Sequence, residues 1–319
     1  MTNIAGNKLI NHLDRVAGDR RPITADVFLD NYCNNRCPYC TYSRWEHEPG
    51  ARAMSYEDFS RYSLRLMELG VRGIILTGGG EPMLAPDFDK ITAWLDAIGM
   101  PYGINTNLNV LKTCKPEYLK VSLDGYDEDS YEKSRGVRKY YAVRENIKAY
   151  ADWKRGNSPS TSLGIQKVCA SVDEVLAFYR ANKDLPVDYM VFRPMESTRG
   201  QYYMIGSKRR EAEKIIEMVK TISDDDPRVV LNFKWNMLGM SFEKCVAHWS
   251  QMAINEKGEV MYCCHKPFQI VGHIMDDDIL EKHARAHTDM NLCDIPCRLT
   301  APNLFMSQVE RGTKNPSFI

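Results

Sequence analysis

Short apolar runs alternate with amphipathic segments along the first two thirds of the chain. Six runs have the length and composition of buried strands, and they cover residues 24–30, 72–78, 102–107, 118–124, 160–169 and 187–194. Segments with apolar residues at helical spacing follow several of them, at residues 56–69, 88–99, 140–153, 172–182 and 209–222. Strand-then-helix units at this rhythm predict a parallel sheet with right-handed crossovers, either open or curled into a partial barrel.

The rhythm stops near residue 235. Beyond that point, residues 250–255 and 259–264 flank a turn that contains Gly258, and this pattern predicts a β-hairpin. No further strand-then-helix unit follows in the cysteine-rich remainder. We therefore expect a domain boundary near residue 235. In an open sheet or a barrel of this kind, the functional site lies beyond the carboxyl ends of the parallel strands.

Charge and hydropathy restrict the class of protein. Lys and Arg number 42, as do Asp and Glu, so the formal net charge is zero and gives no support for binding to nucleic acid or to a membrane surface. No stretch approaches 18 consecutive apolar residues, and the N-terminus lacks the apolar centre of a signal peptide. We expect a soluble, cytoplasmic protein, in which ten cysteines indicate metal ligands or reactive thiols rather than disulfides.

Three of these cysteines directly follow the first predicted strand, at the spacing C-x3-C-x2-C: Cys33, Cys37 and Cys40. They could bind zinc with His47 as the fourth ligand. Alternatively, they could hold a [4Fe–4S] cluster with three thiolates, which leaves one iron open to a small molecule. The motif TGGGEP at residues 77–82 favours the cluster, because glycine lets the backbone approach a ligand closely and Glu81 offers a carboxylate to an ammonium group.

These two motifs, in this order, resemble the signatures of the radical S-adenosylmethionine (SAM) superfamily, and the resemblance extends from residue 22 to about residue 200. It implies an α/β fold with a partial (β/α)6 TIM-like barrel over residues 22–234, preceded by a helical extension over residues 1–21. It also implies a [4Fe–4S] cluster on the three cysteines, with SAM bound to the fourth iron. Such an enzyme cleaves SAM reductively to a 5′-deoxyadenosyl radical, using an electron from an external low-potential donor such as flavodoxin or ferredoxin.

The resemblance assigns further residues to cofactor binding. Tyr39 would lie against the adenine, and the glycine motif with Glu81 would hold the methionine amine. Ser122, in the segment VSLDG, would contact the carboxylate or the ribose, whereas Asp124 is expected either there or in stabilising the turn. The complete set of expected cofactor contacts is Tyr39, Gly78, Gly79, Gly80, Glu81, Asn105 (or its neighbour Asn107), Ser122, Gln166 and Arg193. For Asn105 or Asn107, Gln166 and Arg193 the substrate is the alternative ligand, and Lys167, a further polar residue at a strand end, is expected to meet either ligand.

A second cysteine group surrounds the predicted hairpin: Cys245, Cys263, Cys264, Cys293 and Cys297. The segment MAINEKGEVMYCC resembles the start of the SPASM and shorter twitch extensions of radical SAM enzymes. This implies a C-terminal domain of a β-hairpin plus helix over residues 235–319, with one auxiliary [4Fe–4S] cluster on Cys245, Cys263, Cys293 and Cys297. The final C-x3-C spacing departs from the commoner C-x2-C, and a structural zinc site on the same four thiolates is the alternative.

Cys264 is the remaining thiol of this group. Consecutive side chains of a strand point to opposite faces, so a ligand role for Cys263 directs Cys264 elsewhere. Cys264 then either donates a hydrogen atom to a substrate radical or packs within the domain.

The leading hypothesis is an enzyme that oxidises or epimerises a C–H centre of a small polar substrate, such as a sugar, an aminocyclitol or a nucleotide. The runner-up is modification of a peptide. A non-catalytic metal-binding or electron-transfer protein is the alternative from another class, and the glycine motif argues against it, because an electron carrier needs no SAM pocket.

Overall fold

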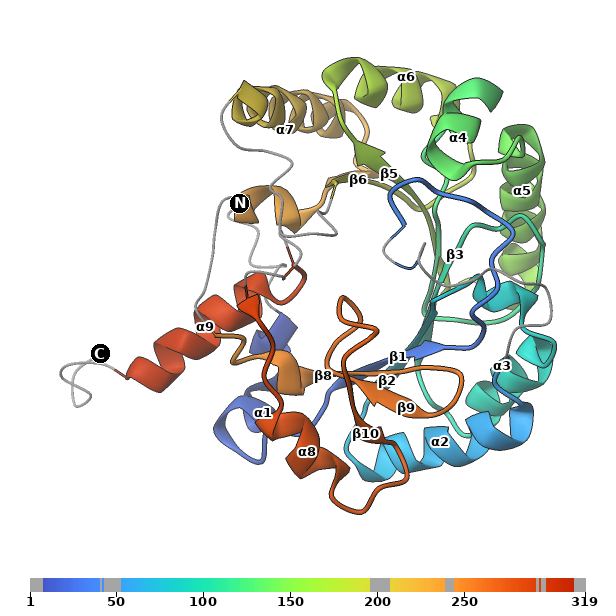
Figure 1. Cartoon of the computed structure of the whole chain (residues 1–319). Coiled ribbons are helices and arrows are strands. Elements are labelled where there is room, and N and C mark those ends of the chain that lie inside the picture. Colours follow the sequence, from blue (N-terminus) through green and yellow to red (C-terminus); the bar gives the residue numbers. More distant parts are fainter. Residues whose placement is uncertain are drawn as a thin grey trace.

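One mixed sheet organises the part of the chain that the computed structural model describes, namely residues 8–40, 42, 53–195, 207–238, 244–290, 293 and 297–312. Its ten strands follow the order β10-β9-β8-β1-β2-β3-β4-β5-β6-β7. They are β1 (Thr24–Phe28), β2 (Gly73–Thr77), β3 (Tyr102–Thr106), β4 (Tyr118–Val121), β5 (Ser162–Cys169), β6 (Tyr189–Pro194), β7 (Val229–Leu231), β8 (Gln251–Ile254), β9 (Glu259–Met261) and β10 (Ile270–His273). Neighbours from β8 through β1 to β7 are parallel, and β9 and β10 are antiparallel. Figure 1 shows the parallel strands curving into an open barrel.

Helices cover the outer face of this barrel (Figure 1). They are α2 (Tyr56–Glu68), α3 (Phe88–Ala97), α4 (Glu128–Arg135), α5 (Tyr140–Asn157), α6 (Val172–Asn182) and α7 (Ser207–Asp225). In α2 the side chain of Ser55 caps the first turn by accepting from the Asp58 N–H, and Phe59, Tyr62 and Leu66 form its buried face. The same cap recurs at Ser171, which precedes α6.

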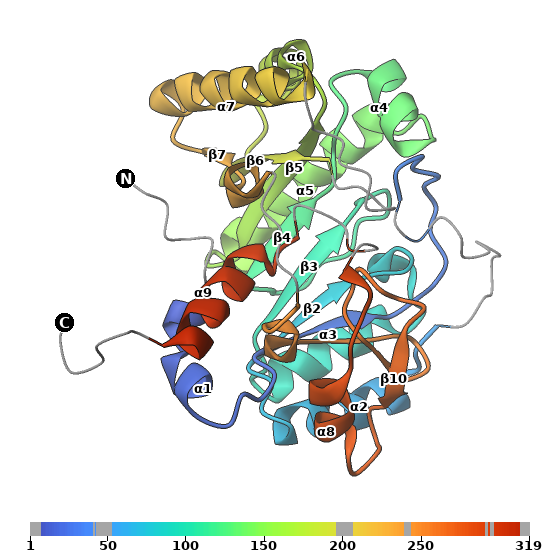
Figure 2. The ribbon, with the colours of Figure 1, turned by 60° about the vertical axis from the view of Figure 1, so that its left-hand side comes forward.

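The remaining helices lie at the two ends of the described chain: α1 (Leu13–Ala17), α8 (Ile279–Arg285) and α9 (Thr300–Arg311). Short 3-10 helices are η2 (Lys8–His12), η3 (Pro82–Leu84), η4 (Phe233–Met237) and η5 (His248–Ser250). Figures 1 and 2 show α9 beside the N-terminal helices. Val16 and Met306 accordingly share a small apolar cluster with Trp249. No helix among the described residues is long and apolar enough to cross a bilayer.

The predicted α/β partial barrel is confirmed, with two differences in its units. The crossover from β3 to β4 carries no helix, in agreement with the lack of a helical pattern between these two runs in the sequence. Helix α4 and strand β7 were not predicted. The sequence of α4, EDSYEKSR, has too few apolar residues to show a helical stripe, and only Tyr131 and Arg135 on it are buried.

The C-terminal hairpin is confirmed as β8 and β9, and it extends the barrel sheet. β8 pairs in parallel with β1, so that Thr24 lies opposite Gln251 and Val27 opposite Ile254. Met252, Ile254 and Val260 belong to the same apolar core as the barrel strands. The small C-terminal unit therefore shares a sheet and a core with the barrel, and the division at residue 235 stays a prediction.

An ion pair with a buried carboxylate fixes the C-terminal segment to the first strand. Asp26, in the middle of β1, is fully buried and receives hydrogen bonds from the guanidinium of Arg298. The Gln251 side-chain amide on β8 donates to the same carboxylate over 2.9 Å. Since side chains alternate along a strand, Asp26 lies on the opposite face to Ala25 and Val27, which pack in the main core.

We expect Arg298→Met to lower the free energy of unfolding by about 3–5 kcal/mol, because it leaves the buried Asp26 carboxylate without its charge partner. Denaturant titration of the purified chain measures this change. Arg155→Met is the matched control, since its ion pair with Asp152 is exposed and such pairs contribute about 0–1 kcal/mol. A loss for Arg298→Met no larger than that of the control would contradict the structural role of this pair.

Candidate active site

A cavity of about 260 Å³ lies at the carboxyl ends of the barrel strands. The described residues that line it are Cys33, Asn35, Cys37, Tyr39, Cys40, Tyr42, Thr77, Gly78, Gly79, Gly80, Glu81, Asn105, Thr106, Asn107, Ser122, Arg135, Gln166, Val168, Arg193 and Met195. Apart from Lys167, this set contains every barrel residue for which the sequence predicts a cofactor contact. The structure thus brings these residues together, while their individual roles stay predictions.

The three thiols of the loop after β1 share this cavity. The sulfur of Cys33 accepts from the Asn35 N–H at 3.4 Å and from the side-chain amide of Asn107 at 3.7 Å. Burial raises the pKa of Cys33 to about 12, so the thiol stays protonated at neutral pH until a bound cation stabilises the thiolate.

The chemistry of these thiols suits an iron–sulfur cluster, because such clusters are held by cysteine thiolates. No three His, Cys, Asp or Glu side chains of the described chain converge on a position for a single metal ion. A [4Fe–4S] cluster does not require such convergence, because each cysteine binds a different iron. His47, the fourth ligand of the zinc alternative, lies outside the described residues.

The glycines after β2 allow the cysteine loop to lie against the end of that strand. A Cβ atom on Gly80 would lie 2.0 Å from the carbonyl oxygen of Tyr32, and one on Gly78 would lie 2.6 Å from the carbonyl oxygen of Gly80. The Gly80 N–H donates to the Asp30 carbonyl at 2.8 Å, and the Glu81 N–H donates to that of Tyr32 at 2.8 Å. The sequence predicts that these glycines let the backbone approach a ligand closely. In the structure they also let the loop after β2 pack against the cysteine loop.

Glu81 joins the ends of β2 and β3. One carboxylate oxygen accepts from the Thr106 hydroxyl at 2.6 Å and from the Met83 N–H at 3.1 Å, and the other accepts from the Asn107 N–H at 2.7 Å. Burial raises the pKa of Glu81, and these hydrogen bonds oppose the shift. The two carboxylate oxygens have about four acceptor positions, so one is left for a donor in the cavity.

An unpaired acceptor faces the same space. The side-chain amide nitrogen of Asn105 donates to the Thr77 hydroxyl at 3.3 Å, while its buried oxygen has no hydrogen-bond partner among the described residues. Buried polar atoms are almost always hydrogen-bonded. The oxygen of Asn105 is therefore an acceptor that a donor group placed in the cavity could satisfy.

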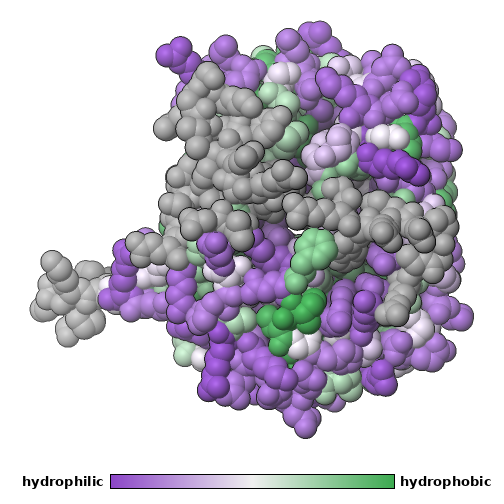
Figure 3. Space-filling model, viewed as in Figure 1, coloured by the Kyte–Doolittle hydropathy of each residue, from purple (hydrophilic) through white to green (hydrophobic). Residues whose placement is uncertain are grey.

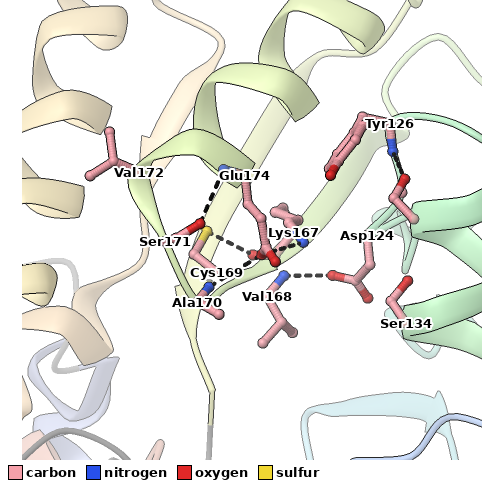
Figure 4. Close-up of polar contacts among 12 residues, drawn as sticks. Asp124, Tyr126, Ser134, Lys167, Val168, Cys169, Ala170, Ser171, Val172 and Glu174 are labelled. Atoms are coloured by element: carbon pink, nitrogen blue, oxygen red, sulfur yellow. Dashed lines mark hydrogen bonds and ion pairs between the residues drawn. The ribbon is translucent and has the colours of Figure 1, made fainter. Parts of the chain in front are cut away.

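Asp124 forms the centre of a charged network at the edge of the cavity. Its backbone is left-handed, with a φ of 51°, and its carboxylate accepts from the guanidinium of Arg135, from the Tyr39 hydroxyl at 3.2 Å and from the Val168 N–H at 2.5 Å. The contact with Val168 is drawn in Figure 4. The sequence left Asp124 between ligand binding and turn stabilisation, and these contacts show that it holds side chains of the site in place.

Arg135 is the main residue of the site that the sequence analysis missed. It ends α4, and its side chain is 10% exposed and donates to the sulfur of Cys37 at 3.5 Å. The capping box at Asp127 and the left-handed Gly136 are sequence signals that could have revealed the helix. They could not have revealed that its last side chain turns inward.

Lys167 does not line the cavity among the described residues, whereas its neighbour Gln166 does. Figure 4 shows the Lys167 ammonium directed to the carboxylate of Glu174 on α6, an ion pair of 3.0 Å. Neighbouring side chains on β5 point to opposite faces, which explains the difference. Of the polar residues expected at the end of β5, only Gln166 is available to a ligand in the cavity.

The second cysteine group gathers between β9 and α9. Cys245 and Cys263 belong to one buried cluster with Tyr262 and Leu299, and the partly buried Cys297 packs against it. Cys293 is half-buried, and burial raises its pKa to about 11. These four thiols are the set expected for an auxiliary cluster, and thiolates are suitable ligands for iron–sulfur clusters.

Asn303 and Leu299 fix two of these sulfurs. The side-chain amide of Asn303 donates to Cys245 at 3.4 Å, and its oxygen accepts the N–H groups of Val246 and Ala247. The Leu299 N–H donates to the sulfur of Cys297 at 3.3 Å. The start of α9 therefore positions the thiols of Cys245 and Cys297.

Cys264 and its neighbour Cys263 belong to different clusters. The alternation expected of a strand is not the reason, because β9 ends at Met261 and both cysteines follow it outside any strand. It packs with Phe28, Ala253 and Met261, and its sulfur accepts a hydrogen bond from Arg298. Tyr42 covers this cluster, and its hydroxyl donates to the Cys264 carbonyl at 2.8 Å. Because Tyr42 also lines the cavity, one aromatic side chain contacts both the cavity and the Cys264 residue.

Comparison with protein families gives one match, to the radical SAM superfamily model over residues 28–165. Among curated relatives, 3-methylornithine synthase of Methanosarcina acetivorans is 24% identical over 64% of this chain and 61% of that protein. GTP 3′,8-cyclase of Stenotrophomonas maltophilia is 29% identical over 37% of this chain and 39% of that protein. An uncharacterised protein of Archaeoglobus fulgidus is 30% identical over 42% of this chain, and the match spans 33% of its own length. The chain thus covers from one third to about three fifths of these relatives.

Solved structures support the fold. Streptococcus suis SuiB bound to its precursor peptide SuiA has a TM-score of 0.65 at 15% identity, with 98% of this chain and 78% of that chain covered. The protein anSMEcpe with bound AdoMet has a TM-score of 0.61 at 14% identity, with 85% of this chain and 82% of that chain covered. At these identities the similarity concerns the fold alone.

Removing the Glu81 carboxylate should destabilise the protein apart from any effect on a ligand. Glu81→Ala leaves the buried donors of Met83, Thr106 and Asn107 without their acceptor, and one such unsatisfied group costs about 1–3 kcal/mol. Glu81→Gln keeps one carbonyl acceptor and should lose less. Thermal and denaturant unfolding of both variants measures this difference, and equal stability of Glu81→Ala and the wild type would contradict it.

Proposed function

We propose that this chain, which belongs to the radical SAM superfamily, is an enzyme that binds a [4Fe–4S] cluster and SAM in the cavity at the strand ends. The cavity itself is the observation that supports this most directly, because three thiols, the glycine motif and a buried carboxylate line one space. A non-catalytic metal-binding or electron-transfer protein would not need the polar cavity beside the thiols. The partner that supplies the electron would be a low-potential protein such as flavodoxin or ferredoxin, and the expected location is the cytoplasm.

The cavity residues would divide the binding of these groups among them. Cys33, Cys37 and Cys40 would hold three irons, and the free acceptor position of Glu81 would receive the ammonium of the methionine moiety. Tyr39 would lie against the adenine, although its hydroxyl is already held by Asp124. When bound, the cluster and SAM together supply the 5′-deoxyadenosyl radical, which takes a hydrogen atom from the substrate.

The proposed substrate is a small polar molecule such as a sugar, an aminocyclitol or a nucleotide. Asn105, Ser122, Gln166 and Arg193 present amide, hydroxyl and guanidinium groups to the cavity. Such groups can hydrogen-bond to hydroxyl and amino substituents, and the unpaired oxygen of Asn105 suits a donor. These features support the substrate class.

A peptide substrate is the second candidate, favoured by an apolar surface. Phe268 and Ile270, at the β9–β10 hairpin, are 60% and 43% exposed. Figure 3 shows hydrophobic residues gathered near the centre of the viewed face. Exposed apolar side chains of this kind suit the side chain of a bound peptide.

The auxiliary cluster is a further part of the proposal. Cys245, Cys263, Cys293 and Cys297 would ligate it within a SPASM/twitch-like unit over residues 235–319, next to the barrel at 22–234 and the extension at 1–21. The gathering of the four thiols beside α9 supports this ligand set.

Iron content tests the proposal. The anaerobically reconstituted chain should contain about eight irons, in two [4Fe–4S] clusters, and the Cys33→Ala/Cys37→Ala/Cys40→Ala variant about four. With dithionite the wild type should release 5′-deoxyadenosine and methionine from SAM, and the triple variant should release neither. Chromatography and iron analysis measure both, and zinc in place of iron at these cysteines would end the proposal.

The fate of the substrate radical distinguishes oxidation from epimerisation. Oxidation requires an electron acceptor near the cavity, whereas epimerisation requires a hydrogen donor that faces the substrate. Cys264 packs among apolar side chains and accepts from Arg298, so a donor role would require it to reach past Tyr42. We therefore favour oxidation.

We expect that turnover in deuterated water places no deuterium on carbon and consumes one SAM per product. Mass spectrometry of products from a panel of sugars, aminocyclitols and nucleosides gives this result for the wild type and for Cys264→Ala. Both proteins should behave alike if Cys264 only packs. Carbon-bound deuterium in the wild-type product that is lost with Cys264→Ala would establish epimerisation instead.

A further inference from the structure

The last turn of α4 is attached to the cysteine loop through its backbone. The Arg36 N–H donates to the Arg135 carbonyl at 2.9 Å. Gly136 follows with a left-handed φ of 73°, which glycine adopts without strain. A Cβ atom at this position would lie 2.4 Å from the carbonyl oxygen of Arg36, so the close approach of the two segments also requires glycine. The position of Arg135 relative to Cys37 is therefore set by the backbone as well as by its side chain.

The guanidinium of Arg135 is held in place by a buried carboxylate. Asp124 has a fully buried side chain and pairs with Arg135, and Val168 and Tyr39 fix the Asp124 carboxylate in turn. From this position Arg135 donates to the sulfur of Cys37 at 3.5 Å and lies over the Tyr39 ring at 6.0 Å from its centroid. Arg135 therefore contacts the sulfur of Cys37 directly. Asp124 instead contacts Arg135, Val168 and Tyr39.

A fixed positive charge beside a cluster ligand favours the reduced cluster. One-electron reduction adds a negative charge to the iron–sulfur group, and a neighbouring cation stabilises that charge. The effect is large in a buried site, where water and salt screen little. Hydrogen bonds and net charge at the sulfurs are known to set the potentials of iron–sulfur clusters.

We propose that Arg135 is a positioning residue that raises the reduction potential of the cluster on Cys33, Cys37 and Cys40 through the sulfur of Cys37. This inference rests on the proposed function, since it presupposes a cluster at these cysteines. The electron comes from the low-potential protein donor, and a higher potential makes its transfer to the cluster more favourable. Through Arg135, the end of α4 therefore affects how readily this cluster is reduced.

Redox titration of the reconstituted full chain without SAM, followed by electron paramagnetic resonance, tests this inference. The relevant signal is the one absent from the Cys33→Ala/Cys37→Ala/Cys40→Ala variant. In Arg135→Gln and Arg135→Met, the ratio of reduced to oxidised cluster at a fixed potential should fall at least tenfold, which for one electron corresponds to about 59 mV. Arg135→Lys retains the charge and should stay within threefold of the wild type.

Arg138→Met is the matched control, because it removes the same charge three residues along the chain. The Arg138 side chain is 55% exposed and pairs with Asp129 and Glu132, so solvent screens it and the potential should not change. A general disturbance of the site would shift Arg135→Lys as much as Arg135→Gln, and that result would overturn the inference. An unchanged potential in Arg135→Gln would overturn it as well. If the wild type shows no signal that depends on the three cysteines, the proposed function itself fails.

Discussion

The contact between the buried Asp26 and Arg298 links the two cysteine groups through a single strand. β1 carries Asp26 at its centre and leads directly into the loop of Cys33, Cys37 and Cys40. Arg298 follows Cys297 in the chain and also donates to the sulfur of Cys264. A charge inside the barrel is costly without a partner, so this pair constrains where the C-terminal segment can lie. The parallel pairing of β8 with β1 also holds the C-terminal segment beside the first strand.

Both groups contain partly or fully buried thiols, and burial has the same consequence in each group. It raises the pKa of Cys33 to about 12 and that of Cys293 to about 11, so these two thiols are protonated at neutral pH without a metal. Binding of an iron–sulfur cluster must then release these protons. Cations moderate the cost: Arg135 donates to Cys37, and Lys266 opposes the rise in the pKa of Cys293. The protein thus places positive charge beside thiols that have to become anionic.

The sequence predicted the parts of the fold that depend on local pattern. Apolar runs identified six parallel strands and the hairpin, and the positions of motifs after β1 and β2 identified the residues that meet in the cavity. This succeeded because parallel strands end at the same edge of a sheet. The sequence could not reveal Arg135, whose polar helix shows no apolar stripe, nor the partner of Asp26, which lies 272 residues away. Lys167 was misread for a related reason, since only the alternation along β5 decides which of two adjacent polar residues faces the cavity.

The motif glycines illustrate how one residue type serves both the fold and the site. Gly80 is required by the carbonyl of Tyr32, which lies immediately before the first cysteine, and Glu81 accepts from the next strand end at Thr106 and Asn107. A larger residue at position 80 would push the cysteine loop away from β2, and with it the thiols away from Glu81 and Asn107. The distances within the site are therefore set by backbone contacts between loops. Tyr42 connects the cavity to the C-terminal unit, because its side chain lines the cavity and its hydroxyl donates to the carbonyl of Cys264. A shift of either cysteine group would consequently be transmitted to the other through one side chain and one hydrogen bond.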